Sequence, residues 1–284
     1  MIYMADICLK IFFISRPRIW LYTLGSFLFG VHLAVLLGYT VDGLSVLLVC
    51  AALTVPVNLF IYALNDYFDA DSDEQNPKKD HFEHRSDSTD GYLLYLAATS
   101  LLLVGCLMVT QEAIVIQLFL LWVFIILTYN IPPLRFKARP GLDMLFAVNF
   151  PLWGFIGYGL VAHELPDLLI VVPIALLSSV FHLYTAVHDI PYDKKSGVIT
   201  SAVYVGSVKN NMYICVILTI LTMVSLVYLG WFWVAVPLVV YLGFFLLHLT
   251  DSVFIGDLLC AYRYFIWIHY IVGILVSVSL LVYV

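Results

Sequence analysis

Two acidic segments stand out in a chain that otherwise carries few charges. The first reads Asn65-Asp66-Tyr67-Phe68-Asp69-Ala70-Asp71-Ser72-Asp73. On a helix, residues three, four or seven positions apart lie on one face. Four side chains have that spacing: Asn65, Asp66, Asp69 and Asp73. Like charges so placed repel each other, and a bound divalent cation reverses that interaction. Mg²⁺ prefers oxygen ligands, commonly one or two carboxylates together with substrate phosphates, so the segment predicts a Mg²⁺–diphosphate site.

The second acidic segment reads His188-Asp189-Ile190-Pro191-Tyr192-Asp193-Lys194-Lys195-Ser196-Gly197. Asp189 and Asp193 are again four residues apart, but Pro191 lies between them and should bend or end the helix. We therefore expect imperfect helical register here. The predicted metal and catalytic set from both segments is Asn65, Asp66, Asp69, Asp73, Asp189 and Asp193. The acids nearby are interpreted as a solvated loop: Asp71, Glu74, Asp80, Asp87 and Asp90. A calcium loop is disfavoured because Glu74 stands where that loop needs glycine.

The elements that carry these segments are strongly apolar. The chain has 284 residues, of which 63% are hydrophobic and 11% are charged, whereas a soluble domain carries roughly 25% charged residues. Runs of about 20 apolar residues can cross a bilayer as helices. Nine such runs lie at about 19–38, 44–64, 91–110, 113–130, 141–161, 168–188, 211–229, 231–248 and 262–284. We therefore predict an all-α integral membrane protein of about nine transmembrane helices.

The basic residues predict the topology. Twelve of the 13 lysines and arginines lie before the first run or in alternate loops, and Arg263 lies at the start of the last run. The loops 39–43, 111–112, 162–167 and 230 contain none. By the positive-inside rule, the N-terminus and both acidic segments are cytoplasmic. The long loops 65–90 and 189–210 lie four runs apart, which suggests two four-helix pseudo-repeats plus a ninth helix in a single domain, 1–284. The net charge of −6 argues against a nucleic-acid partner.

These segments resemble signatures of a known family. NDYFDADSD (65–73) fits the Asn-Asp-x-x-Asp-x-x-x-Asp motif of the UbiA superfamily of intramembrane prenyltransferases, and DIPYDKKSGVIT (189–200) is similar to its second motif. The stretches SRPRIWLY, NPKK, PPLRFKARPGLD and HLYTAVHDIPYDKKSG look most like the lycopene elongase (carotenoid) branch. The resemblance implies a UbiA-like fold. It also implies Mg²⁺-dependent transfer of an isoprenyl group from an allylic diphosphate, dimethylallyl diphosphate, to lycopene or a related carotenoid.

The resemblance also implies roles for basic and aromatic residues. Diphosphate contacts are expected from Arg135, Lys137, Lys78, Lys194 and Arg16, with guanidinium groups able to grip phosphate oxygens in a fork. A water-free chamber for a carbocation is expected to involve Tyr62, Tyr129, Phe150, Trp153 and Tyr184, because aromatic faces attract cations. Asn149 either faces that chamber or bonds a neighbouring helix. Many members have Lys where this chain has His188, and Lys194 is the candidate substitute.

Three other interpretations compete with this one. The same chemistry could serve another acceptor, such as a quinone precursor or other aromatic ring, haem, a chlorophyll precursor or a phosphoribosyl group. A transporter is disfavoured, because transporter sites usually lie near the bilayer midplane on broken helices. An inactive family member is disfavoured by the intact acidic set. The sequence does not predict the oligomeric state.

Overall fold

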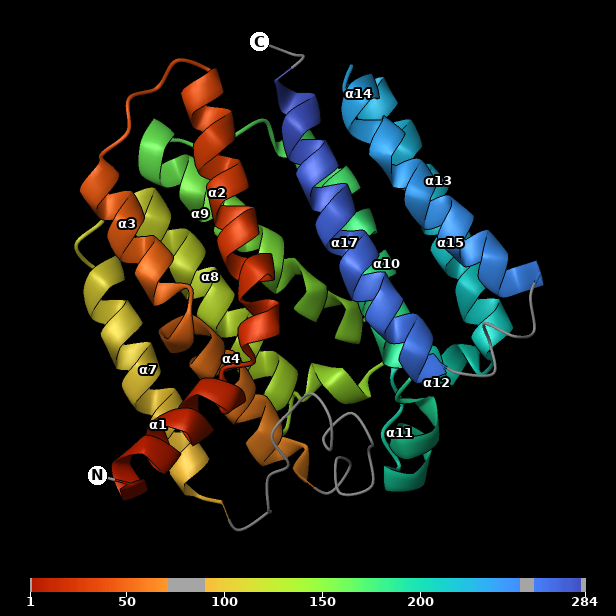
Figure 1. Cartoon of the computed structure of the whole chain (residues 1–284), viewed down its shortest axis with the longest axis horizontal. Helices are drawn as coiled ribbons and strands as arrows, with labels where there is room; N and C mark the ends of the chain where they lie inside the picture. Colours follow the sequence, from red (N-terminus) through yellow and green to blue (C-terminus); the bar gives the residue numbers. More distant parts are fainter. Residues whose placement is uncertain (1, 71–89, 251–257, 282–284) are drawn as a thin grey trace. The chain divides into compact units, whose positions relative to one another are not determined.

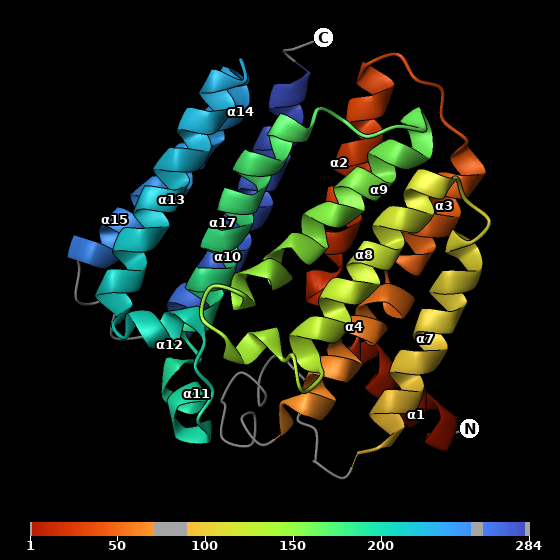
Figure 2. The ribbon, with the colours of Figure 1, turned by 180° about the vertical axis from the view of Figure 1, so that it is seen from behind.

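The structure is a computed structural model that describes residues 2–70, 90–250 and 258–281, and all regular elements in these ranges are helical. The chain forms two compact units. The first contains Met1–Arg135 and Asn149–Leu165, and the second contains Phe136–Val148 and Pro166–Val284. Figures 1 and 2 show the helices of each unit from opposite sides. Whether the chain is one domain stays a prediction.

The first unit consists of seven α-helices and one short 3-10 helix in the described residues. These are α1 (Ile2–Ile14), η1 (Pro17–Ile19), α2 (Trp20–Leu36), α3 (Gly43–Ala52), α4 (Val55–Phe68), α7 (Tyr92–Met108), α8 (Ala113–Asn130) and α9 (Asn149–Ala162).

The second unit begins with the segment that follows α8. Its described elements are η2 (Phe136–Ala138), η3 (Asp143–Val148), η4 (Leu168–Ile170), α10 (Val171–Val187), α11 (Ile190–Ser196), α12 (Ser201–Val205), α13 (Val208–Tyr228), α14 (Phe232–Ala235), η5 (Val236–Leu238), α15 (Val239–Thr250) and α17 (Leu258–Leu280).

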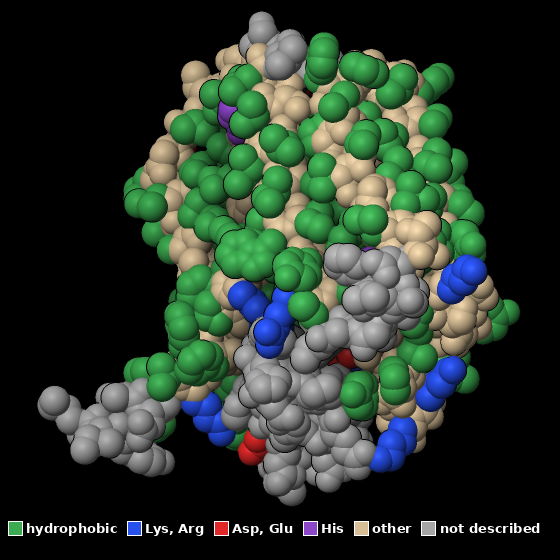
Figure 3. All heavy atoms as spheres, turned by 45° about the vertical axis from the view of Figure 1, so that its right-hand side comes forward, with side chains coloured by type: hydrophobic (Ala, Val, Ile, Leu, Met, Phe, Trp, Pro, Cys, Tyr) green, Lys and Arg blue, Asp and Glu red, His purple; other side chains and the backbone are tan. Residues whose placement is uncertain are grey.

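Eight helical spans of the described chain are long and apolar enough to cross a membrane, and α7 is a shorter apolar helix. Together these correspond to the nine predicted runs, so the prediction of an all-α membrane protein is confirmed. Large hydrophobic side chains such as Leu44, Leu102 and Trp267 are exposed, and hydrophobic side chains cover most of the face in Figure 3. Such a surface suits lipid rather than water.

The run 44–64 is not one helix, contrary to the sequence-based expectation. It breaks between α3 and α4, and Pro56 lies in the first turn of α4, where its missing N–H costs nothing. A break in lipid exposes backbone carbonyls that must find donors. The Asn58 amide donates to Leu53 O over 2.7 Å and to Thr54 O over 2.9 Å, and Thr23 Oγ1 donates to Leu53 O over 3.1 Å. These three hydrogen bonds hold the start of α4, and α4 carries the first acidic segment.

Two glycines bring α2 and α9 into backbone contact. A Cβ atom added at Gly30 would lie 1.8 Å from Gly154 O, and one added at Gly157 would lie 2.2 Å from Phe27 O. Figures 1 and 2 show the two helices side by side. Small residues permit such close approach in membranes. The α9 part of the fifth run therefore belongs to the first unit, whereas the residues of that run up to Val148 belong to the second, so the two compact units do not coincide with the predicted four-helix halves.

The start of α3 is capped by Asp42. Its carboxylate accepts a hydrogen bond from the Ser45 hydroxyl over 2.6 Å, and from the backbone N–H groups of Leu44 and Ser45 over 3.1 and 3.3 Å. The Ser45 hydroxyl, followed by these N–H groups, holds the pKa of the Asp42 carboxyl below its usual range. Asp42 therefore satisfies helix N–H groups that have no partner within the helix.

Candidate active site

Asp66, near the end of α4, is fully buried and ion-paired. Arg16 Nη2 donates to Asp66 Oδ1 over 2.6 Å. The same guanidinium lies over the ring of Tyr62, 4.3 Å from its centroid. A buried carboxylate is costly unless it is paired and hydrogen-bonded, and Arg16 supplies that pairing. Tyr62, one helical turn before Asp66, supports the guanidinium from its face.

Asp69 and Asn65 form a second polar group at the same helix end. Asn65 Nδ2 donates to Asp69 Oδ2 and lies 3.4 Å from Asn130 Oδ1 of α8. The Asn65–Asp69 contact shows the predicted four-residue helical spacing. Arg135 Nη2 lies 3.6 Å from Asp69 Oδ1 and donates to Phe68 O over 3.0 Å. Arg135 thus contacts both an acidic side chain and a terminal carbonyl of α4.

Arg16 and Arg135 share an unusual backbone conformation. Their φ angles are 51° and 33°, in the positive region that residues with a Cβ atom rarely adopt. Arg16 precedes α2 and Arg135 follows α8. Each places its guanidinium against an aspartate of the first acidic segment. Strained backbone of this kind tends to occur at functional sites, where surrounding contacts over-determine it.

The second acidic segment lies at the junction of α10 and α11. α10 ends at Val187 and α11 begins at Ile190, with Pro191 in its first turn, so the predicted break near Pro191 is confirmed. The helical spacing of the two acids nevertheless survives, because Asp193 N–H donates to Asp189 O over 2.8 Å. Asp189 is half-buried and Asp193 is 4% exposed. Both therefore keep the four-residue register despite the break.

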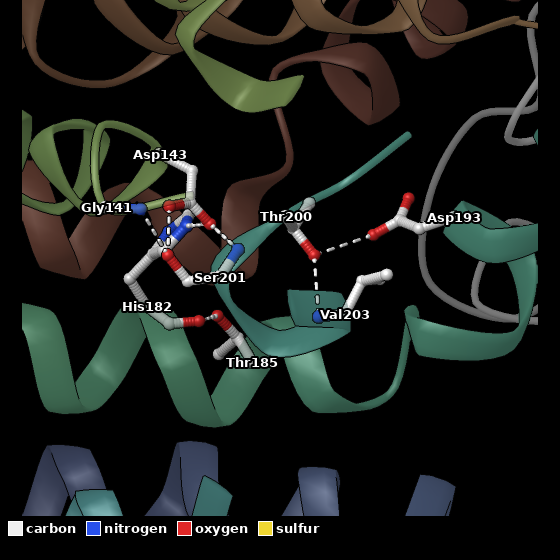
Figure 4. Close-up of polar contacts among 8 residues, drawn as sticks. All are labelled: Gly141, Asp143, His182, Thr185, Asp193, Thr200, Ser201 and Val203. Carbon is white, nitrogen blue, oxygen red and sulfur yellow. Dashed lines mark hydrogen bonds and ion pairs between the residues drawn. The ribbon is translucent and has the colours of Figure 1, made fainter. Parts of the chain in front are cut away.

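A buried network beside this segment was not predicted. Asp143, at the start of η3, is fully buried and accepts hydrogen bonds from the backbone N–H of Ser201 over 2.7 Å and from its hydroxyl. His182 Nε2 of α10 lies 3.5 Å from Asp143 Oδ2, and Gly141 N–H donates to Ser201 Oγ over 2.8 Å. Figure 4 shows this group. One signal in the sequence could have revealed it, since Asp143 is the only acid in the apolar run 141–161.

The predicted chamber residues divide between the units. Tyr62, Tyr129, Asn149, Phe150 and Trp153 are buried in the first unit. Asn149 Oδ1 accepts from Trp122 Nε1 over 3.1 Å, so the amide bonds the neighbouring helix α8, one of its two predicted roles. The Trp122 ring also packs against Trp153, with centroids 5.1 Å apart. An aromatic wall is thus present in the first unit, and its role toward substrate stays a prediction.

Tyr184 lies in an aromatic cluster of the second unit. Its ring contacts Phe244 and Phe265, with centroids 5.4 and 4.2 Å away, and its hydroxyl lies 3.3 Å from His248 Nε2. His188, which replaces the more common lysine, is buried with its ring 5.1 Å from that of Tyr262. Both residues therefore join the packing of α10 against α15 and α17.

The expected phosphate-binding cations occupy different surroundings. Arg16 and Arg135 lie on the first acidic segment, as described above. Lys137 is half-buried in η2 and Lys194 is exposed on α11. Asp73 and Lys78 lie outside the described residues. Within the described residues, no group of three or more acidic, histidine or cysteine side chains is close enough to hold a metal by itself. The chemistry of Asn65, Asp66 and Asp69 still fits Mg²⁺, because these are oxygen donors and substrate phosphates usually complete its coordination.

Comparison with known proteins identifies the family. Residues 23–268 match the UbiA prenyltransferase family. The chain belongs to this family. Among curated relatives, "Lycopene elongase/hydratase" of Haloarcula japonica is 34% identical over 212 residues, covering 72% of this chain and 69% of that protein. The protein of the same name from Halobacterium salinarum is 34% identical over 198 residues, covering 69% and 71%. That from Corynebacterium glutamicum is 26% identical over 242 residues, covering 80% and 82%.

Solved structures show the same fold. A UbiA homologue from Archaeoglobus fulgidus bound to DMAPP and Mg²⁺ superposes with a TM-score of 0.69 at 19% identity, covering 93% of this chain and 99% of that one. The apo UbiA homologue from Aeropyrum pernix gives 0.68 at 18% identity, covering 92% and 97%. The UbiA-like fold predicted from the sequence is confirmed. The chain is an integral membrane prenyltransferase.

Proposed function

We propose that this enzyme transfers the dimethylallyl group of an allylic diphosphate to a carotenoid, lycopene or a close relative, with Mg²⁺ as cofactor. The observation that carries the donor end is the pairing of two buried carboxylates with arginines, Asp66 with Arg16 and Asp69 with Arg135. Carboxylates bind a divalent cation and guanidinium groups bind phosphate oxygens. A magnesium–diphosphate complex offers both partners at once. The acceptor is supported by the names of the curated relatives.

The proposed reaction begins at the bond between the allylic carbon and the diphosphate oxygen. This bond breaks, and diphosphate leaves with the electron pair. A double bond at the end of the carotenoid supplies the electrons of the new carbon–carbon bond. The resulting cation either loses a proton, or adds water through its oxygen and then releases a proton from that oxygen. Bound Mg²⁺ would neutralise the negative charge that develops on the leaving group.

The residues of the chain divide this work. Arg16 and Arg135 bind oxygens of the leaving diphosphate, with Lys78, Lys137 and Lys194 as further candidate contacts. The acidic set, Asn65, Asp66, Asp69, Asp73, Asp189 and Asp193, holds the metal.

The aromatic residues are assigned to the cation. Those predicted for the chamber (Tyr62, Tyr129, Trp153 and Tyr184) exclude water and present ring faces to positive charge. Asn149 keeps the chamber wall in place through Trp122. Exclusion of water matters for the first cation, the dimethylallyl cation, because water would trap it before it reaches the carotenoid.

The orientation follows from the basic residues. Twelve of the 13 lysines and arginines precede the first apolar run or lie in alternate loops, and Arg263 lies at the start of the last run; basic loops face the cytoplasm. We infer that the N-terminus and both acidic segments are cytoplasmic, where a water-soluble diphosphate is available. The test is labelling by a membrane-impermeant thiol reagent of two variants, Arg139→Cys and Glu112→Cys. Reagent added on the cytoplasmic side should label the cysteine at position 139 and not the one at position 112.

The test of function uses the full chain in lipid nanodiscs with radiolabelled dimethylallyl diphosphate, Mg²⁺, and either lycopene or 4-hydroxybenzoate. We expect label in carotenoid and none in the aromatic ring, with EDTA abolishing transfer. Labelled benzoate without labelled carotenoid would refute the carotenoid acceptor while leaving the donor chemistry intact.

The metal set is tested by diphosphate release in the same system. Asp66→Asn and Asp189→Asn should each lower its rate at least about 100-fold, which corresponds to roughly 2.7 kcal/mol of transition-state stabilisation. Glu112→Gln is the matched control, because Glu112 is exposed in a loop without basic residues and should keep wild-type activity. Wild-type release by both aspartate variants would refute the donor site.

A further inference from the structure

Asp143 lies far before the second acidic motif in the sequence but is connected to it through a short chain of polar contacts. Its carboxylate is fully buried, and both oxygens accept hydrogen bonds from Ser201, one from the backbone N–H and one from the hydroxyl. Such a buried charge is tolerated only where donors surround it, and His182 provides a further nitrogen 3.5 Å away. Asp143 therefore fixes the position of Ser201 at the start of α12.

The residue before Ser201 continues this chain toward the motif. Thr200 is the N-cap of α12, and its Oγ1 accepts from Val203 N–H over 3.3 Å. The same hydroxyl donates to Asp193 Oδ2 over 3.4 Å. A hydroxyl has one donor and two acceptor sites, so Thr200 can hold both contacts together. In Figure 4, Thr200 lies between the Asp143 group and Asp193.

A second connection joins the backbone of Asp193 to the segment just before Thr200. Val198 N–H donates to Asp193 O over 2.9 Å, and Gly197, with φ of 73°, turns the chain out of α11. The backbone and the side chain of Asp193 are thus both held by residues 198–200. The Thr200 hydroxyl, 3.4 Å from Asp193 Oδ2, contacts one oxygen of the carboxylate and so restrains its rotation.

We propose that Asp143 is a positioning residue for the second acidic motif. Through Ser201 and Thr200 it holds the Asp193 carboxylate in the orientation that binds the magnesium–diphosphate end of the prenyl donor. This inference rests on the proposed function, in which Asp193 serves the metal. It gives a purpose to the one acidic residue in the apolar run 141–161.

The network is tested by changing Thr200, the residue that contacts Asp193. Thr200→Val removes the hydroxyl at nearly constant volume, and Thr200→Ser keeps it. We expect Thr200→Val to raise the KM for Mg²⁺ by about tenfold, the effect of losing one hydrogen bond to a charged group, with a smaller change in kcat. Thr200→Ser should restore the KM. Asp143→Asn should shift the KM for Mg²⁺ in the same direction, and Ser207→Ala at the N-cap of α13 is the matched hydroxyl deletion that should not.

A binding measurement separates positioning from a general loss of structure. The melting temperature is recorded with and without Mg²⁺ plus a non-ionisable thiolo analogue of dimethylallyl diphosphate. Thr200→Val should reduce the rise in melting temperature that the ligands cause, and Thr200→Ser should retain that rise. In the double variant with Asp193→Asn, the effect of Thr200→Val should disappear, because Thr200 acts through Asp193.

The outcomes distinguish the two proposals. If Asp193→Asn impairs Mg²⁺ dependence but Thr200→Val and Asp143→Asn behave as wild type, the positioning role is wrong and the proposed function stands. If Asp193→Asn itself leaves the KM for Mg²⁺ and the ligand-induced rise unchanged, the metal role of Asp193 fails and the positioning role fails with it.

Discussion

Arg16 Nη2 and Asp66 Oδ1 lie 2.6 Å apart, although fifty residues separate them in the sequence. The contact joins the short segment before η1 to the end of α4, and it compensates a carboxylate that is fully buried. Both residues were predicted from the sequence to act at the donor site. Their direct pairing makes each dependent on the other.

The first prediction concerns this pair. Arg16→Ala should lower prenyl transfer by about 10- to 100-fold, because a hydrogen bond to a charged group is worth about 1.5–3 kcal/mol. Arg16→Lys should recover only part of the activity, since an ammonium group lacks the planar fork of guanidinium. The measurement is kcat/KM for dimethylallyl diphosphate. Arg139→Ala, at an exposed arginine, is the control, and an equal loss there would contradict a specific role for Arg16.

The second prediction concerns the contact between α2 and α9. Gly30→Ala should lower the melting temperature in detergent by roughly 5–10 °C, because overpacking typically costs 1–3 kcal/mol or more. The added methyl group meets the Gly154 carbonyl, which cannot rotate away as a side chain could. Gly25→Ala on the same helix is the matched control, since no atom lies within 4 Å of the added Cβ. Equal melting temperatures for the two variants would contradict the backbone contact.

The third prediction concerns the break before α4. Asn58→Leu should destabilise the protein by about 1–3 kcal/mol, the cost of leaving buried polar groups without partners. Two carbonyls, Leu53 O and Thr54 O, lose the amide donor. Hydrogen exchange of the α3 and α4 backbone amides should also accelerate. Asn210→Leu, at an exposed position, should change neither quantity, and a similar loss there would point to a nonspecific effect.

The fourth prediction is a pH dependence at the cap of α3. The pKa of Asp42 is lowered in the folded protein, so its stabilising effect is present above the unfolded pKa and is lost as pH falls through the folded value. Asp42→Ala should therefore lower the melting temperature at pH 7, and the difference from wild type should shrink below about pH 4. Asp42→Asn preserves a good cap and should stay near wild type at pH 7. A difference in melting temperature between Asp42→Ala and wild type that does not change with pH would contradict a contribution from the charge of Asp42.

Hydrophobic run length and basic loops were sufficient to predict the membrane helices. The donor end stays a prediction. It rests on several acidic residues on one helix face, which repel each other unless a cation binds between them, and an apolar chain rarely carries such a cost without a ligand. The break at Thr54 could not be predicted, because periodicity does not reveal that Asn58 will replace the missing backbone donors. The pairing of Asp143 with Ser201 depends on a contact across 58 residues, and no local pattern encodes it.

The packing of the fifth run was also beyond the sequence pattern. Counting runs and placing the loops suggested two equal halves, whereas the choice of neighbour for α9 depends on which helix offers a matching glycine. Gly30 and Gly157 decide this through backbone approach. Shape complementarity of that kind is a property of two surfaces together and is not visible in either segment alone.

Gly30 therefore complicates any search for the reactive centre by random mutagenesis. A screen for lost prenyl transfer would mark position 30 as intolerant as Asp66, although glycine there contributes no charge, proton or ligand. Counting surviving substitutions would rank the two positions together. Only a screen that also reports the amount of folded protein in the membrane would separate Asp66, the residue proposed to bind the metal, from Gly30, which leaves room for a neighbouring helix.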